Sequence, residues 1–290
     1  MKRLLIDAKD LIELVERGTP IAAADFSRWL TDHDARVVLT YTNVTEFADC
    51  LRHIDDLLYV RSIIQVLESV PHVYLREVTI EVDEIALAIA AFDSESEPKL
   101  PDPYVPRWDQ TFAIRGKSPP AEMIVDYRLD LMVFDIMKQP DRRRTAMPRA
   151  ALKAIENDRA VPVAERIGPR ESLTGALGRM ITFWKLPSPS KDVRAFGKWV
   201  YGVPTRCPGF RLAWELFRAM VSNAEDVLAL SDVWDNAHFP AIPYVDCVTL
   251  DRRMTGYCRE VGRRLRKADV SIDYGEKTFR NLDDLMKAMS

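Results

Sequence analysis

Three short runs of apolar and β-branched residues constrain the fold of this chain more than any other feature. They are Leu4–Ile6, followed by Asp7; Val37–Leu39, followed by Thr40; and Val245–Leu250, followed by Asp251. Runs of this length are typical of buried parallel strands, although length alone does not separate a strand from a buried helix. Helical spacing of apolar residues between the runs favours alternation of strand and helix. The pattern therefore predicts an α/β fold with a central parallel sheet.

Helical patterns fill most of the remaining sequence. Apolar spacing and start signals predict helices over about 11–17, 20–30, 43–51, 54–70, 79–92, 118–138, 150–157, 173–184, 210–222, 224–235 and 252–267. Residues 72–75 are a candidate third strand, and the proline-containing stretches 94–106 and 186–191 are expected to be loops.

The alternation of strand and helix is confined to the two ends of the chain. A length of 290 residues suggests roughly two domains or one large one. Residues 1–75 and 224–290 carry the strand patterns, whereas residues 76–223 show no strand alternation and no repeat. We expect one sheet domain built from both ends and interrupted by a large, mainly helical insertion over 76–223.

Composition and targeting signals exclude several classes of protein. The 41 basic and 44 acidic residues give a net charge of −3, which excludes a uniformly basic nucleic-acid coat but leaves room for a local basic groove. No secretory signal and no run long enough to cross a bilayer are present. The four cysteines, Cys50, Cys207, Cys247 and Cys258, lack zinc-like spacing. We expect reduced thiols, a cytoplasmic protein and no membrane contact.

Four acidic residues stand at comparable places in the expected fold. Asp7 and Asp251 follow strands, Glu46 opens the helix after the second strand, and Asp235 lies on the helix before the last strand. Because the carboxyl ends of parallel strands share one edge of a sheet, these carboxylates are expected to converge. Carboxylates at close range repel one another unless a cation compensates them, and oxygen ligands suit Mg²⁺ or Mn²⁺. The pattern predicts a metal site.

Each acid also has a structural interpretation. Glu46 can complete a capping box with Asn43, and Asp251 can cap the helix that starts at Arg252. Asp7 can accept hydrogen bonds from loop amides, and Asp235 can be a solvated helix charge. The alternative metal ligands are Asp10, Asp232 and Asp246. A packed or hydrogen-bonded role is favoured over a metal-binding role for His238.

Motifs around the four acids resemble those of the PIN-domain nucleases. Ile6-Asp7-Ala8-Lys9-Asp10 and Thr40-Tyr41-Thr42-Asn43-Val44-Thr45-Glu46-Phe47 are similar to the first two acidic motifs of that family, and Asp235-Asn236-Ala237-His238 and Tyr244-Val245-Asp246-Cys247-Val248-Thr249-Leu250-Asp251 to the third and fourth. Asp10 stands where the family often has Asn, and the middle segment is far longer than the connection of a compact PIN domain. The resemblance covers about residues 1–75 and 224–290.

The resemblance implies a three-layer α/β/α sandwich and a metal-dependent hydrolysis of phosphodiesters, most often in RNA. Asp7, Glu46, Asp235 and Asp251 match the metal-binding acids of the family. We therefore expect an endoribonuclease of PIN type that depends on Mg²⁺ or Mn²⁺ and forms no covalent intermediate. A catalytically silent scaffold that binds RNA or protein, and a nuclease that acts on DNA, are the alternatives. A homodimer, and a protein partner bound through the insertion, stay open.

Basic residues near the expected site suit a phosphate-bearing substrate. Expected substrate-binding residues are Thr249, which the resemblance places beside the last acid, and Arg252, Arg253, Arg263 and Arg264 on the helix after Asp251. A second basic cluster, formed by Arg142, Arg143, Arg144, Arg149 and Lys153, lies in the insertion. For any single arginine, a solvated helix face is the simpler interpretation.

Overall fold

The computed structural model describes residues 1–16, 20–51, 56–107, 110–111, 133, 137 and 146–290. The expected helix 118–138 and the arginines Arg142, Arg143 and Arg144 lie outside the described residues, apart from positions 133 and 137. Side chains of a few residues inside helices, Asp235 and Cys50 among them, are also outside the described set.

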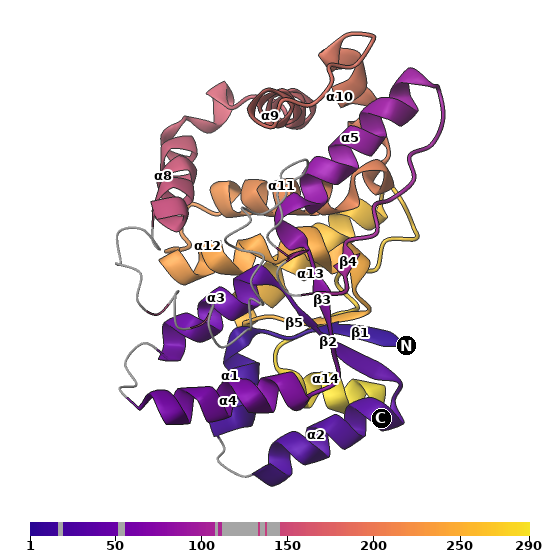
Figure 1. Cartoon of the computed structure of the whole chain (residues 1–290). Helices are drawn as coiled ribbons and strands as arrows, with labels where there is room; N and C mark the ends of the chain where they lie inside the picture. The colour runs from indigo at the N-terminus through magenta and orange to yellow at the C-terminus, as the bar shows by residue number, and fades with distance from the viewer. Residues whose placement is uncertain (17–19, 52–55, 108–109, 112–132, 134–136, 138–145) are drawn as a thin grey trace.

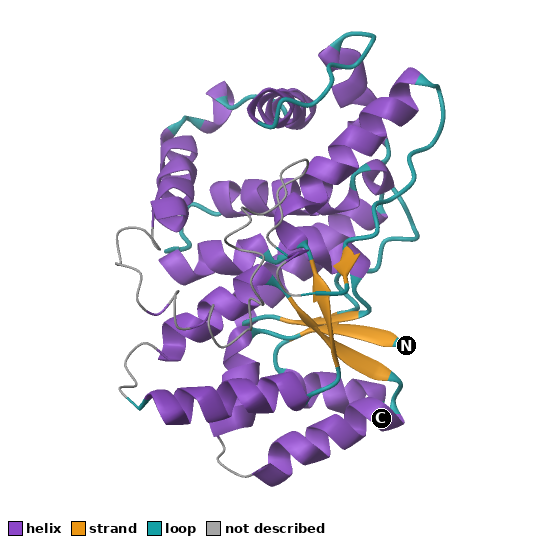
Figure 2. Cartoon of the chain, in the orientation of Figure 1, coloured by secondary structure: helices purple, strands orange, loops and turns teal. Residues whose placement is uncertain are grey.

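Six strands form one mixed sheet in the order β4-β3-β2-β1-β5-β6 (Figure 2). The strands are β1 (Lys2–Leu5), β2 (Ala35–Leu39), β3 (His72–Leu75), β4 (Tyr104–Val105), β5 (Cys247–Thr249) and β6 (Thr278–Phe279). All neighbours pair in parallel except β3 and β4, which are antiparallel. The predicted α/β class and the parallel central strands are confirmed, whereas β4 lies in a stretch expected to be a loop, and β6 was not predicted.

Helices make up most of the described chain (Figures 1 and 2). In the first half they are α1 (Ala8–Glu16), α2 (Pro20–Asp32), α3 (Tyr41–Cys50), α4 (Leu57–Ser69), the 3₁₀ helix η2 (Glu77–Thr79) and α5 (Ile80–Asp93). In the second half they are α8 (Ala146–Ala160), η5 (Val163–Glu165), α9 (Pro169–Phe183), α10 (Val193–Gly202), η6 (Pro204–Arg206), α11 (Pro208–Ser222), α12 (Leu230–Ala237), η7 (Phe239–Tyr244), α13 (Arg252–Arg266) and α14 (Leu282–Met289).

Both faces of the sheet are covered by helices, which agrees with an α/β/α sandwich. On one face, Leu4 of β1 and Val37 of β2 pack into a core with α1, α2, α3, α4 and α14. On the other face, Leu5 and Val38 pack with α11, η7 and α13. Strand residues buried on both faces need apolar side chains at successive positions, and this explains the uninterrupted apolar runs in the sequence.

The middle segment, 76–223, contributes to the sheet domain as well as to a separate helical layer. Strand β4 pairs with β3, and Leu212 and Leu216 of α11 lie in the same core as Leu5 and Val248. Helices α5, α9, α10 and α11 enclose a further apolar core. The region expected to be an insertion therefore supplies part of the helical cover of the sheet.

Several helix boundaries differ from those expected, helices α10 and α14 were not predicted, and two of the differences lie near the candidate acids. Helix α12 begins at Leu230 rather than near Ala224, and α3 begins at Tyr41 rather than at Asn43. At the start of α3, Thr40 Oγ1 accepts from Asn43 N at 3.1 Å, and Asn43 Oδ1 accepts from Thr40 N at 3.3 Å. This reciprocal pair is the capping box of α3, so the predicted box between Asn43 and Glu46 is wrong. Glu46 is thereby left free for other contacts.

Candidate functional site

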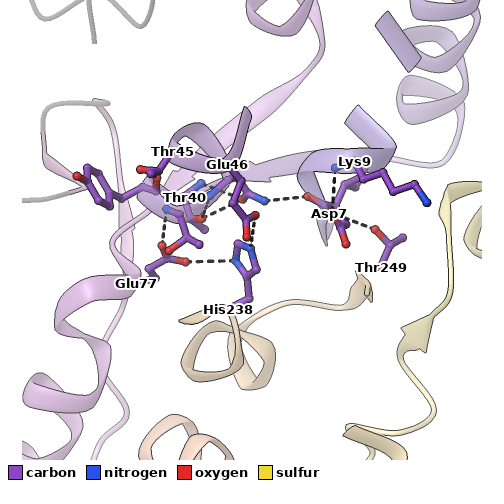
Figure 3. A network of polar contacts seen from close by, with 12 residues as sticks. Asp7, Lys9, Thr40, Thr45, Glu46, Glu77, His238 and Thr249 are labelled. Carbon is purple, nitrogen blue, oxygen red and sulfur yellow. Dashed lines mark hydrogen bonds and ion pairs between the residues drawn. The ribbon is translucent and has the colours of Figure 1, made fainter. Parts of the chain in front are cut away.

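The carboxyl ends of the parallel strands gather acidic side chains from separate parts of the sequence. Asp7 follows β1, Glu46 lies on α3 after β2, and Glu77 opens η2 after β3 (Figure 3). Asn43 ties two of these elements together, because its Nδ2 donates to Ile6 O at 2.9 Å while its Oδ1 caps α3. The sheet topology and this buried amide hold Asp7 and Glu46 at one edge, as predicted.

Asp7 is fixed by its own backbone surroundings. Its N–H donates to Thr249 Oγ1 at 2.8 Å, and its Oδ1 accepts from Lys9 N at 2.8 Å. The register of β1 on β5 brings Thr249 beside the start of the Asp7 loop. Asp7 therefore bonds an amide in the first turn of α1 and not a loop amide, so its structural role is that of a helix cap, while its second carboxylate oxygen has no hydrogen bond to the described residues.

Asp10 joins this group from the first turn of α1. It is 9% exposed, and burial raises the pKa of its carboxyl to about 6, although a hydrogen bond with Thr249 opposes the rise. The negative charge of Asp7 raises the pKa further. Thr249 thus contacts both Asp7 and Asp10, so the two aspartates lie close together.

His238 lies between the half-buried carboxylate of Glu46 and the buried carboxylate of Glu77, as Figure 3 shows. Its Nε2 is 3.1 Å from Glu46 Oε2, and its Nδ1 is 3.6 Å from Glu77 Oε2. Burial lowers the pKa of His238, but the charges of Glu46 and Glu77 outweigh burial and raise it well above its usual value of 6.5. The surroundings of His238 thus favour its protonated form, and its contact with Glu46 agrees with the hydrogen-bonded role that was favoured for it.

Glu77 is the acid that the sequence analysis did not single out. Its Oε1 accepts from Thr42 N at 2.6 Å, whereas its Oε2 is buried without a hydrogen bond. The signal was available, because Glu77 comes just after the candidate strand 72–75, as Asp7 comes just after Leu4–Ile6. The rule that gathered Asp7 and Glu46 applies equally to this position.

Asp235 lies on α12, which packs against both α3 and α13. Its helix therefore passes close to the elements that carry Glu46 and Asp251, and His238 follows it by three residues. The side chain of Asp235 is outside the described residues.

Asp251 caps α13, with Oδ1 accepting from Met254 N at 2.6 Å. This is the structural role that the sequence left open for it. Because β5 pairs with β1 in parallel, Asp251 also stands at the same end of the sheet as Asp7. A carboxylate has two oxygens, so the cap leaves Asp251 Oδ2 for a further ligand.

The two remaining alternative ligands have other surroundings. Asp232 is buried and accepts from Arg253 Nη1 at 2.7 Å and from Ala229 N at 2.5 Å. Asp246 precedes β5, so it stands at the amino end of the sheet, where its Oδ2 accepts from Arg3 N at 2.7 Å. The prediction of Asp246 as an alternative ligand is therefore corrected. Asp246 precedes its strand and so lies at the end of the sheet opposite Asp7.

Some arginine side chains of α13 are held by partners within the fold, and others are exposed. Arg253 pairs with Asp232 and donates to Val227 O, and Arg264 pairs with Glu260. Arg263 reaches the backbone of its own helix, and Arg252 is exposed. Arg252, Arg253 and Arg263 line one cavity of about 690 Å³ that also touches Asp251. These arginines lie near Asp251, as expected. Arg253, however, is already bound to Asp232 and to Val227 O within the fold.

Among the side chains that the structure describes, no group of three or more histidine, cysteine, aspartate or glutamate residues is arranged to hold a metal ion. The donor chemistry nevertheless suits a divalent cation: Asp7, Asp10 and Glu46 offer oxygens, burial and Asp7 raise the pKa of Glu46, and Glu77 Oε2 has no hydrogen bond to the described residues. Asp235 would complete such a set. A protonated His238 would offset part of this negative charge, because its ring lies beside Glu46 and Glu77.

No protein-family profile, no curated protein and no solved structure matches the chain. In the described segments, every helix falls short of the length and apolar character needed to cross a membrane.

Proposed function

We propose that the carboxyl edge of the sheet is the active site of a nuclease that depends on Mg²⁺ or Mn²⁺, with RNA as its favoured substrate and a PIN-like fold. The observation that carries the proposal is that Asp7 lies close both to Asp10, at the start of α1, and to Glu46, on α3, with the pKa of Asp10 and of Glu46 raised by burial and by the charge of Asp7. Acids that repel one another in this way favour a cation.

Asp7 and Glu46, with Asp235 and Asp251, would hold the ion. A bound divalent ion supplies an activated water and stabilises the oxygen that leaves the phosphorus. Thr249 positions Asp7 by accepting a hydrogen bond from the Asp7 backbone N–H. Asn43 positions Glu46 because its hydrogen bond to Ile6 O anchors α3, the helix that carries Glu46. Arg252 and Arg263, beside Asp251, would contact substrate phosphates, which makes binding sensitive to salt.

The test is cleavage of mixed pools of RNA and of DNA by the purified chain, with Mn²⁺ or with a chelator. We expect cleavage of RNA only with the metal, and loss of cleavage in Glu46→Gln. The matched control is Glu13→Gln on α1, an acid outside the expected ligand set. Metal-independent cleavage, or full activity in Glu46→Gln, would contradict the proposal. Preferential cleavage of DNA would support the deoxyribonuclease alternative.

One observation favours a second candidate, a catalytically silent scaffold. A protonated His238 offsets one of the two negative charges of Glu46 and Glu77 from within the chain, so this pair of acids needs less compensation from a metal. A scaffold of this kind would bind RNA or protein without cleavage. Mn²⁺ discriminates between the two candidates, because a metal site present only in the folded chain raises the melting temperature, whereas a scaffold melts at the same temperature with and without the ion.

A further inference from the structure

The amino edge of the sheet, opposite the acids, carries two arginines in direct register. Arg3 of β1 pairs with Arg36 of β2 in the parallel ladder. Side chains alternate along a strand, so both arginines share the face on which Leu5 and Val38 are buried. Like charges directly opposite each other on neighbouring strands destabilise a sheet. This pair is therefore a feature that folding alone does not favour.

The guanidinium groups of Arg3 and Arg36 have no carboxylate partner in the described part of the chain. Asp34 is held by the ammonium group of Met1 at 2.5 Å, and Asp246 Oδ2 accepts from the backbone N–H of Arg3. Arg36 is exposed and Arg3 is half-buried. The positive charge of this pair is thus left to an external anion or to solvent.

An aromatic wall stands beside the arginines. The Arg3 guanidinium lies 3.8 Å from the centre of the Tyr104 ring, although β2 and β3 separate their strands. The Tyr104 hydroxyl donates to Tyr244 O at 2.6 Å, which fixes the ring. A guanidinium held against a fixed ring is already ordered, so less conformational entropy is lost when a ligand binds.

The same residues border a cavity of about 480 Å³. Its lining includes Arg3, Arg36 and Tyr104 together with the apolar side chains of Val73 and Pro106. This volume falls within the range of small-molecule sites. Guanidinium groups match the oxygens of a phosphate, and the apolar wall suits a less polar body attached to it.

We propose that this cleft, which we name the Arg3–Arg36 cleft, binds a nucleoside 5′-phosphate, with the phosphate on the two arginines and the nucleoside against Tyr104, Val73 and Pro106. The ligand is a free nucleotide or the 5′-phosphorylated end of a nucleic acid, since both carry the same group. Arg3 is the second residue of β1, and Asp7 follows that strand, so about 13 Å of extended backbone separates Arg3 from Asp7. The proposal therefore goes beyond the proposed nuclease site and does not depend on it.

Calorimetric titration of the purified chain in a chelator tests this site while the acids hold no metal. The probes are adenosine 5′-monophosphate, adenosine, inorganic phosphate, and one short oligonucleotide with either a 5′-phosphate or a 5′-hydroxyl. We expect the monophosphate to bind at least tenfold more tightly than adenosine and inorganic phosphate. Binding of the 5′-phosphorylated oligonucleotide in preference to its 5′-hydroxyl form identifies nucleic-acid ends as a source, and binding of the mononucleotide alone identifies free nucleotides.

Arg36→Gln removes one guanidinium from an exposed position and leaves the stack of Arg3 on Tyr104 in place. We expect it to weaken binding at least tenfold and not to lower the melting temperature of the free chain, because it also removes the repulsion. Arg194→Gln, on the exposed side of α10, is the matched control and should bind as the parent does. Absence of binding by the parent, equal affinity for adenosine, equal affinity for inorganic phosphate, or parental affinity in Arg36→Gln would overturn the proposal.

Discussion

His238 Nε2 lies 3.1 Å from Glu46 Oε2, and this contact joins two residues that are 192 positions apart in the sequence. The histidine comes from the turn after α12, whereas the glutamate lies on α3, so the pair fastens the last part of the sheet domain to the first. Glu77 approaches the other ring nitrogen. One buried histidine thus lies between two carboxylates and offsets part of their charge, at the place where the active site is proposed.

Replacement of His238 by alanine is expected to lower the free energy of unfolding by about 3–5 kcal/mol, because the buried carboxylate of Glu77 and the half-buried carboxylate of Glu46 would lose their positively charged neighbour. The loss depends on pH. The folded-state pKa of His238 is raised above its ordinary value of 6.5, so its contribution is fully present below that pH and disappears as the pH rises through the raised pKa. Urea unfolding of the parent and the variant between pH 6 and about 10 measures this difference. A difference that stays constant over the range would contradict the imidazolium.

Thr249→Val should destabilise the chain by about 1–3 kcal/mol, because Asp7 N–H loses its acceptor and Asp10 loses a hydrogen bond in a buried place. Thr249→Ser keeps the hydroxyl and is the matched control. Denaturant unfolding at neutral pH compares them. No loss in Thr249→Val, or a loss in Thr249→Ser as large as that in Thr249→Val, would contradict this role of the hydroxyl.

Glu84 holds the start of α11 to α5. Its carboxylate accepts from Gly209 N at 2.7 Å, from Phe210 N at 2.9 Å and from the Tyr244 hydroxyl at 2.6 Å. Glu84→Ala leaves these buried donors without an acceptor and should lower the free energy of unfolding by about 3 kcal/mol or more. Glu84→Gln keeps one oxygen and should lose less, and similar losses in the two variants would contradict this role.

The same carboxyl predicts a pH effect of definite sign. Burial raises the pKa of Glu84 from 4.5 to about 7, so its contribution to stability is complete below pH 4.5 and declines as the pH rises through 7. The stability advantage of the parent over Glu84→Gln should therefore shrink from pH 5 to pH 8. An advantage that grows over that range, measured by chemical unfolding, would contradict the burial of this carboxyl without a counter-charge.

Asp251 is expected to combine a cap with a place in the metal site, and two substitutions separate these roles. Asparagine also caps helices well, so Asp251→Asn should leave the free energy of unfolding within about 0.5 kcal/mol of the parent and still reduce cleavage. Asp251→Ala should lose cleavage and about 0.5–2 kcal/mol of stability. Full cleavage by Asp251→Asn would assign this residue to the cap alone.

Local signals in the sequence were sufficient for the central strands and for the convergence of Asp7 and Glu46. Each buried strand is an uninterrupted apolar run, and parallel pairing places the residues after such runs at one edge. Strands β4 and β6 span two residues each, which is too short for a periodic pattern to be visible. Their existence depends on pairing with β3 and β5, which a single sequence does not reveal.

The contacts of individual site residues were less predictable. The partners of Glu46 and Arg253 are 192 and 21 positions away, and they follow from how α12 packs and not from any local motif. Asn43 was assigned to the wrong capping box because Asn43 N–H bonds to a residue before it in the chain, Thr40, and not to the residue after it that the motif suggested. Tertiary packing therefore decided which polar groups became free for chemistry.

Cleavage of RNA by Asp7→Asn in the presence of Mn²⁺ tests the proposed active site most directly. Asparagine preserves the oxygen that accepts from Lys9 N, so the variant should fold, and Asp246→Asn at the opposite edge of the sheet is the matched control. Because a divalent ion contributes several kcal/mol to such a reaction, we expect the initial rate to fall at least about a hundredfold in Asp7→Asn and to stay at the parental value in Asp246→Asn. Equal rates in the parent and in Asp7→Asn, or no cleavage by the folded parent, would contradict the assignment of this edge as a nuclease site.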